Sequence, residues 1–230
     1  MGHSQASKVR SHERILRIAA RMFREKGLEG LSIATLMQKA DLTHGGFYKH
    51  FSSRDDLLTQ ALTIALAEAD EPENYAKYLA PIEPREMTFD LFVRAYLGKI
   101  HRDDPSSACA VGTLVSDVGR AGKDVKDLYT ARVKKNLESL IALMSGPRGK
   151  RDPSAALVVF SAMVGAFALA RATSDRTLAD DLLKAVQDFV LTEFSPARYK
   201  RTRKLRASPR QPGRPWPWLR RSPAGNPYCT

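Results

Sequence analysis

The sequence predicts an all-α protein with two helical domains, a small one at the amino terminus and a larger one behind it. Apolar residues recur every three or four positions, as in helices that bury one face, and no alternating strand pattern persists. Each helical stretch is bounded by proline, glycine or aspartate, which cap or end helices. With 230 residues, 43% of them apolar and 27% charged, the chain can bury a small core and a medium one.

The first helix is expected over residues 9–25. Its apolar face carries Ile15, Ile18 and Phe23, while arginines line the other faces. Gly27 follows as a C-terminal cap. The residues before this helix show no apolar pattern, so we expect them to be disordered.

Two short helices are expected next, over residues 31–50. Ser32 is a good N-cap for the first and Thr43 for the second. In the second helix Phe47 and Phe51, four residues apart, turn inward, and small or polar residues face outward. The pattern predicts a helical hairpin with one exposed polar face.

Two adjacent glycines, Gly45 and Gly46, stand in the second short helix, although each costs roughly 1 kcal/mol relative to alanine. Glycine lets a backbone approach a partner closely, and His44 and Lys49 beside them are donors suited to phosphates and base edges. A recognition helix in a DNA groove explains this pattern, and so does a hairpin with a solvated basic face. The serines and aspartates of residues 52–56 form overlapping capping boxes that start another helix at once, which favours the DNA-binding interpretation.

One run, over residues 15–58, combines these features. It carries Phe23, Gly27, the Phe-Tyr-Lys-His-Phe block at 47–51 and the serine-capped, acidic helix start at 52–56. These residues resemble the amino-terminal domain of the tetracycline-repressor (TetR/AcrR) family of bacterial regulators. The resemblance implies an all-helical, repressor-like homodimer with a helix-turn-helix DNA-binding domain and a second domain that binds a small ligand.

The resemblance and the residue types together predict the DNA contacts. Expected at phosphates are Thr43, Tyr48, His50 and Arg54, with Ser32 and Thr35 from the preceding helix; expected at the groove floor are His44, Lys49 and the backbone of Gly45 and Gly46. Lys49 is the only long donor on this face, so direct base readout is thin and shape readout matters. A dimer would offer two such helices about 34 Å apart to a palindromic operator in double-stranded DNA. The family usually has glycine in place of Asp41 and often lysine in place of Arg54.

The chain is expected to divide into four parts. These are a disordered amino terminus at 1–7, the DNA-binding domain at 8–68 with its helix-turn-helix at about 31–50, a ligand-binding and dimerisation domain at 69–196, and a basic, Pro/Arg-rich disordered tail at 197–230. The net charge of +12 lies at the two ends: residues 1–60 carry 10 basic and 6 acidic groups, and the tail carries 10 basic groups and no acid. Such a tail adds non-specific, salt-sensitive DNA affinity or is a functionless extension.

Five helices are expected in the larger domain, after a Pro-rich break. They span residues 87–101, 108–119, 125–144, 155–173 and 178–194. In the resembled family the last two core helices form the dimer interface, so we place it at 155–173 and 178–194. The stretch 155–170 is sixteen residues without a charge, fewer than the roughly twenty that span a bilayer, so no membrane partner is expected. We expect a cytoplasmic protein, associated with the nucleoid when bound to DNA.

The middle helices offer candidates for a ligand pocket. They are Phe92, Tyr96, Cys109, Leu114, Tyr129, Phe160, Met163 and Phe167. The same residues also suit an ordinary core. The near-neutral middle domain and its lack of a buried-charge signature favour a mostly apolar effector, whose identity the sequence does not give.

The residues admit three other interpretations. Cys109, close to His101 and Arg102, is either a redox- or electrophile-sensing thiol or a small packed hydrophobe. The run His101-Arg102-Asp103-Asp104 invites an acid-base or metal interpretation, but it lacks a second ligand at metal spacing, a nucleophile elbow and a phosphate loop. We therefore expect no catalytic residues, metal or cofactor. A helical protein that binds DNA without sequence preference is the third alternative.

Overall fold

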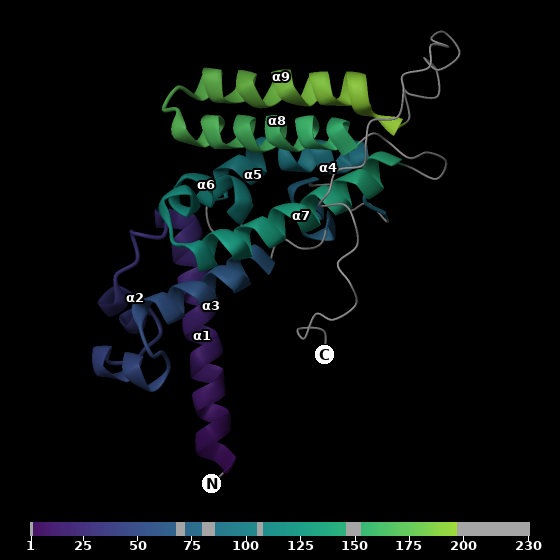
Figure 1. The fold of residues 1–230 in the computed structure, drawn as a ribbon. Helices are drawn as coiled ribbons and strands as arrows, with labels where there is room; N and C mark the ends of the chain where they lie inside the picture. The colour runs from purple at the N-terminus through teal and green to yellow at the C-terminus, as the bar shows by residue number, and fades with distance from the viewer. Residues whose placement is uncertain (1, 68–71, 80–85, 105–107, 146–152, 197–230) are drawn as a thin grey trace.

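The computed structural model describes residues 2–67, 72–79, 86–104, 108–145 and 153–196, and these residues form helices and loops without a strand. The helices are α1 (Gly2–Lys26), α2 (Ile33–Lys39), the 3-10 helix η1 (His44–Lys49), α3 (Arg54–Ala67), the 3-10 helix η2 (Pro72–Leu79), α4 (Phe89–Tyr96), α5 (Lys99–Asp103), α6 (Ala110–Arg120), α7 (Lys123–Ser145), α8 (Pro153–Ala172) and α9 (Arg176–Phe194). Figure 1 shows α8 and α9 as an antiparallel pair along one side, with α1, α2 and α3 toward the other. The all-α prediction is confirmed, and the expected tail at 197–230 lies outside the described residues.

The small domain, called the head below, consists of α1, α2, η1 and α3. α1 packs against α3 and α2, and α2 packs against η1. Phe23, Leu36, Phe47 and Leu62 are almost fully buried where these helices meet. Gly27 ends α1 in the left-handed conformation, with φ of 75°, and its amide donates to the Phe23 carbonyl at 2.8 Å.

Two helix boundaries differ from the sequence prediction. α1 begins at Gly2 instead of residue 9, so the expected disorder over 1–7 is wrong for residues 2–7; extending a formed helix adds a hydrogen bond for each residue fixed. The helix expected over 87–101 is two, α4 and α5. Gly98 lies at the break, where a side-chain Cβ would approach the Arg94 carbonyl oxygen to 3.0 Å.

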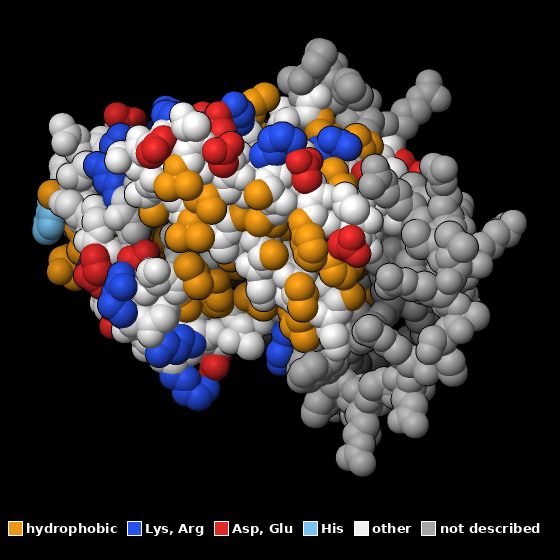
Figure 2. All heavy atoms as spheres, turned by 90° about the horizontal axis from the view of Figure 1, so that it is seen from above, with side chains coloured by type: hydrophobic (Ala, Val, Ile, Leu, Met, Phe, Trp, Pro, Cys, Tyr) orange, Lys and Arg blue, Asp and Glu red, His pale blue; other side chains and the backbone are white. Residues whose placement is uncertain are grey.

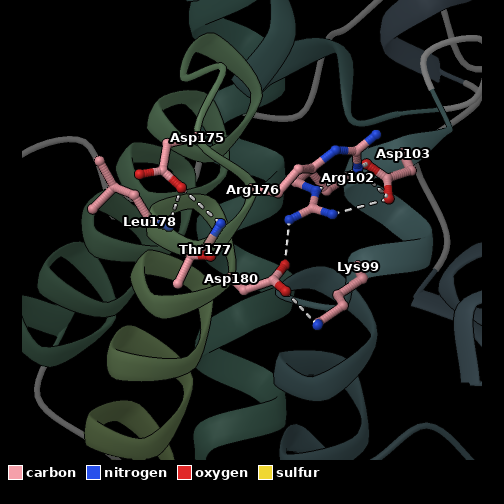
Figure 3. A network of polar contacts seen from close by, with 8 residues as sticks. All are labelled: Lys99, Arg102, Asp103, Asp175, Arg176, Thr177, Leu178 and Asp180. Carbon is pink, nitrogen blue, oxygen red and sulfur yellow. Dashed lines mark hydrogen bonds and ion pairs between the residues drawn. The ribbon is translucent and has the colours of Figure 1, made fainter.

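The larger domain, called the body below, consists of η2 and α4 to α9. An ion-pair network joins its helices α5 and α9 (Figure 3). The guanidinium of Arg102 contacts Asp180 at 2.6 Å and Asp103 at 2.9 Å, and Lys99 also pairs with Asp180. Arg176 of α9 returns to Asp103 at 3.1 Å. Because Arg102 is only 7% exposed, these carboxylates compensate a largely buried cation.

Helix α8 is the only helix in the described ranges that is long and apolar enough to cross a membrane, with a mean hydropathy of 1.9. From the sequence, the uncharged stretch 155–170 was predicted to be too short to span a bilayer. The helix itself is longer, because α8 starts at Pro153 and has 20 residues. Length and composition are weak evidence, because a core helix passes the same test. α8 packs against α9, α7 and α6 and buries Val159, Met163 and Phe167, so one side of it lies in the core.

A buried histidine, His101, lies at the centre of the body. Its Nδ1 is 2.7 Å from the Tyr96 carbonyl oxygen, and its Nε2 accepts a hydrogen bond from the Cys109 amide at 3.1 Å. Its ring stacks on Phe167 with centroids 4.4 Å apart. Burial lowers the pKa of His101 to about 4, so the imidazole is neutral at pH 7 and carries its proton on Nδ1.

Acid is expected to destabilise the folded chain through His101. The unfolded imidazole binds a proton near pH 6.5 and the folded one only near pH 4, so this contribution is intact above pH 6.5 and is lost as the pH falls toward 4. Between pH 7.5 and 5 the free energy of unfolding should fall by about 2 kcal/mol from this group. Urea unfolding of His101→Gln should show a shallower pH dependence, while the Thr43→Ala control, at an exposed residue without a titrating group, keeps the parent slope. Equal slopes in all three proteins would contradict the assignment.

Candidate nucleic-acid interface

The turn between α2 and η1 fixes where the expected DNA-facing residues lie. Ser32 caps α2 by accepting a hydrogen bond from the Thr35 amide at 3.4 Å, as predicted. Asp41 ends the helix with φ of 53°, the left-handed conformation that glycine adopts without strain. Arg14 of α1 braces this turn, since its guanidinium contacts the Asp41 carboxylate at 3.4 Å and donates to the Ala40 carbonyl. The turn therefore forms with aspartate where the resembled family usually has glycine.

The second short helix is the 3-10 helix η1, anchored through its phenylalanines. Phe47 and Phe51 are 1% and 2% exposed, and their ring centroids lie 5.3 Å apart. The prediction that this side turns inward is confirmed. Thr43 occupies the N-cap position, but its side chain makes no capping hydrogen bond there.

The opposite side of η1 is open to solvent. Tyr48 is 70% exposed, with its ring edge-on to Phe47 at 5.2 Å. Thr43, His44, Gly45 and Lys49 are exposed as well. We call these five residues the η1 ridge.

Neither glycine of η1 is required by the packing of the head. A Cβ added at Gly45 would meet no atom within 4 Å, and one at Gly46 would make ordinary contacts of 3.5 Å with Met37 and 3.7 Å with Thr43. Neither has a positive φ, since Gly27 is the glycine with that conformation in the described residues. The helix therefore accepts two unfavourable residues without a reason inside the fold.

Two of the predicted phosphate contacts, Arg54 and His50, lie beside the η1 ridge and already touch other residues of the head. The Arg54 guanidinium donates to the Leu28 carbonyl at 3.4 Å and lies 3.7 Å from the Glu29 carboxylate. His50 ends η1 half-buried, with its ring 5.9 Å from that of His12. His12 was not predicted from the sequence, although it falls three residues before Ile15 on the same helical face.

The capping boxes behind η1 are present in part. The Ser53 hydroxyl accepts from the Asp56 amide at 3.0 Å, while the Asp56 carboxylate accepts from the Ser52 amide and hydroxyl, each at 2.9 Å. These hydrogen bonds, with one from Gln60, lower the pKa of Asp56 below its usual value. They fix the start of α3 against the end of η1.

The ligand-pocket candidates are distributed around a packed aromatic cluster in the body. Tyr96 lies 5.9 Å from Phe92 and 5.5 Å from Phe167 between ring centroids, with Cys109, Leu114 and Met163 also buried. Phe160 is partly buried on α8, and the half-buried Tyr129 donates to the Val111 carbonyl at 2.8 Å. The residues missed by sequence are Tyr75, Tyr78 and His101, whose rings contact the same cluster.

The expectation that the middle domain lacks buried charge is wrong. Arg102 and Arg132 are 7% and 6% exposed. Burial lowers the pKa of Arg132 to about 10. A single arginine on a helix such as α7 gives no sequence signal of which side it faces, so its burial depends on tertiary packing.

Two candidate chemistries were predicted, one at His101 of α5 and one at Cys109, the N-cap of α6. Cys109 is 1% exposed, and both ring nitrogens of His101 are engaged in hydrogen bonds, so neither side chain is open to a reagent or substrate in this conformation. In the described residues no group of three His, Cys, Asp or Glu side chains could hold a metal ion.

Comparison with known proteins gives one family match, which covers the head. Residues 15–61 match the model for bacterial regulatory proteins of the tetR family, and no curated protein matches the chain. Among solved structures, a TetR transcriptional regulator from Chloroflexus aurantiacus is 20% identical over 80% of this chain and 96% of its own, with a TM-score of 0.61. A TetR-family transcriptional regulator from Streptomyces coelicolor is 22% identical over 85% and 96%, with a TM-score of 0.59.

A third solved structure is the transcriptional regulator FadR from Bacillus subtilis in complex with stearoyl-CoA. It is 13% identical over 78% of this chain and 97% of its own, with a TM-score of 0.56. These structures show that the body has the same fold as theirs, and the model match covers the head. The head therefore matches the tetR family of bacterial regulatory proteins, and the chain as a whole has the fold of solved TetR regulators.

Proposed function

We propose that the chain is a sequence-specific DNA-binding transcriptional regulator that a small molecule releases from a palindromic operator. The observation that carries the proposal is the pair Gly45 and Gly46, which the packing of the head does not require. A partner outside the chain that must approach the backbone closely supplies the missing reason. The exposed donors of the η1 ridge fit a DNA groove as that partner.

The DNA-facing roles follow from exposure on the η1 ridge and, for the half-buried Thr35 and His50, from their positions beside it. Tyr48, Thr43 and His50 contact phosphates, with Ser32 and Thr35 contributing from the start of α2, and His44 and Lys49 reach the groove floor. Arg54 reaches a phosphate beside its present contacts, since its side chain is 41% exposed. With Lys49 as the only long donor on the ridge, recognition rests on duplex shape as well as on base edges.

Helices α8 and α9 form the dimer interface of the proposed regulator. Four large apolar side chains on this pair are about half exposed: Val158 56%, Leu169 57%, Leu178 49% and Phe189 57%. Figure 2 views the molecule from this side and shows apolar side chains gathered across it. A second copy of the chain would bury this face and set the distance between the two heads.

The effector binds in the body and changes the positions of the two heads by moving the middle helices. α6 packs against α1 and α3, and α7 packs against α3, so movement of the middle helices changes the position of the head. The solved relative that holds stearoyl-CoA supports an effector with a large apolar part. Release then follows from a difference in effector affinity between two head spacings.

Two alternatives have distinct signatures. A thiol sensor at Cys109 requires that the buried sulfur become reachable, so labelling of the folded protein with iodoacetamide at that residue would support it. A general DNA binder would protect no discrete site, whereas a specific regulator protects a palindrome in footprinting.

Gly45→Ala should fold as well as the parent or better and should bind DNA more weakly. Alanine favours a helical backbone by up to about 1 kcal/mol, and its methyl group would stand where the duplex approaches. Against a duplex selected by the parent protein from genomic fragments, we expect a loss of roughly tenfold or more. Gly119→Ala is the matched control, because a Cβ at this helical glycine also meets nothing within 4 Å. Parent-like affinity of Gly45→Ala would remove the main support for the proposal.

Phe189→Glu should convert a dimer into a monomer, because a carboxylate would replace the largest exposed ring of the α8/α9 face. Sedimentation velocity measures the change, and affinity for the palindrome should fall roughly 100-fold as the second head is lost. Val115→Glu, at an exposed apolar residue of α6, is the control and should remain dimeric. A monomeric parent, or a Phe189→Glu protein that stays dimeric, would contradict this interface.

A further inference from the structure

Two histidines meet directly behind η1. His50 ends that helix, and His12 of α1 lies with its ring centroid 5.9 Å away. His12 is held by stacking on Phe51, with centroids 4.8 Å apart, and by a 2.9 Å hydrogen bond between its Nε2 and the Gln60 side-chain oxygen. We call His12 and His50 the histidine pair; it joins α1, η1 and α3.

The surroundings of the pair oppose a positive charge on His50. Burial, then His12, Lys8 and Lys49, in decreasing order, lower the pKa of His50 below its usual value. The Nδ1 atom of His50 is buried and has no hydrogen-bond partner within the part of the chain that the structure describes. Asp56 of α3 is a carboxylate that interacts electrostatically with His12. Its oxygens already accept hydrogen bonds from Ser52 and Gln60.

We propose that the histidine pair links DNA binding to proton uptake, so that the head binds duplex more tightly as the pH falls toward 6. The proposal rests on the proposed function, which places His50 against a backbone phosphate. A phosphate within a few ångströms favours the imidazolium and offsets the cations that disfavour it in the free head. If DNA binding raises the proton affinity of His50 by some factor, then protonation of His50 must raise the affinity for DNA by the same factor.

The free head responds to acid in the opposite direction. Its His50 has a lowered pKa, so this group's contribution to stability is intact above the usual histidine pKa and is lost as the pH falls through that value. Affinity for DNA should therefore rise over the same pH range in which the stability of the free protein falls. Acid unfolding by itself would lower both the DNA affinity and the stability. A rise in affinity together with a fall in stability is therefore specific to a group whose protonation is linked to DNA binding.

His12 acts as a positioning residue. It does not reach the η1 ridge, but its ring and its bond to Gln60 hold the partner against which His50 is packed. His12→Gln removes one of the groups that lower the pKa of His50 and should move the pH dependence of binding to higher pH. A purely structural role would change affinity at every pH and leave the midpoint unchanged.

The test measures the dissociation constant of the full-length protein for its selected duplex between pH 6.0 and 8.0 at fixed ionic strength. Affinity should rise with falling pH by up to roughly tenfold per unit for each proton taken up. His50→Gln should flatten this slope. Thr43→Ala, at an exposed residue of the η1 ridge without a titrating group, should weaken binding but keep the slope. Circular dichroism checks that each variant is folded, and His50→Asn serves if the glutamine variant is not.

The imidazole signals give a second measurement that does not depend on a variant. In NMR titrations of the parent protein, the midpoint of His50 should lie below that of a free imidazole without DNA and should rise when the duplex is added. An unchanged midpoint, or a pH slope that survives in His50→Gln, would overturn the inference while leaving the proposed function intact. A parent protein that binds no duplex at any pH would overturn both.

Discussion

The burial of Phe47 and Phe51 is the interaction on which the head depends. η1 has six residues, two of them glycines, and is too short to be stable through its own backbone hydrogen bonds. Each phenylalanine, buried to 1% or 2% exposure, contributes about 1.5–3 kcal/mol. The two side chains thus hold in place a segment that would not be helical alone. The η1 ridge is exposed because its other side is anchored in this way.

Local strain near the ridge is compensated by residues distant in sequence. Asp41 adopts a left-handed conformation that disfavours a side chain, and Arg14 of α1 offsets this by binding both its carboxylate and the Ala40 carbonyl. The head therefore combines a well-packed interior with an exposed segment, Asp41 to Lys49, in which several residues are unfavourable for the local backbone conformation. Such a combination is expected where a protein surface is selected for a partner and not for stability.

The features predicted from sequence are those that depend on neighbouring residues. Ser32 as an N-cap, the inward side of η1 and the capping of α3 each involve positions within four residues of one another, and all three are present. The features that were missed join residues far apart: His12 with His50, Arg54 with Leu28, and Arg102 with Asp180. Each single residue in these pairs looks like an ordinary solvated side chain, because only the packing of helices brings the partners together. The break at Gly98 was missed for a similar reason, as glycine within an apolar pattern is also tolerated inside helices.

The contacts of the body indicate how a change at its centre would reach the head of the proposed regulator. Arg102 ties α5 to Asp180 of α9, so α5 moves with the pair that we assign to the dimer interface. The next residue back, His101, is bonded through Nε2 to the Cys109 amide at the start of α6. At its other end α6 meets the head, where the Asp117 carboxylate lies 3.0 Å from the position of a Cβ on Gly27. In the proposed dimer, an effector that separates the aromatic rings around His101 would displace the start of α6, and the packing of α6 against α1 would carry that displacement to the head.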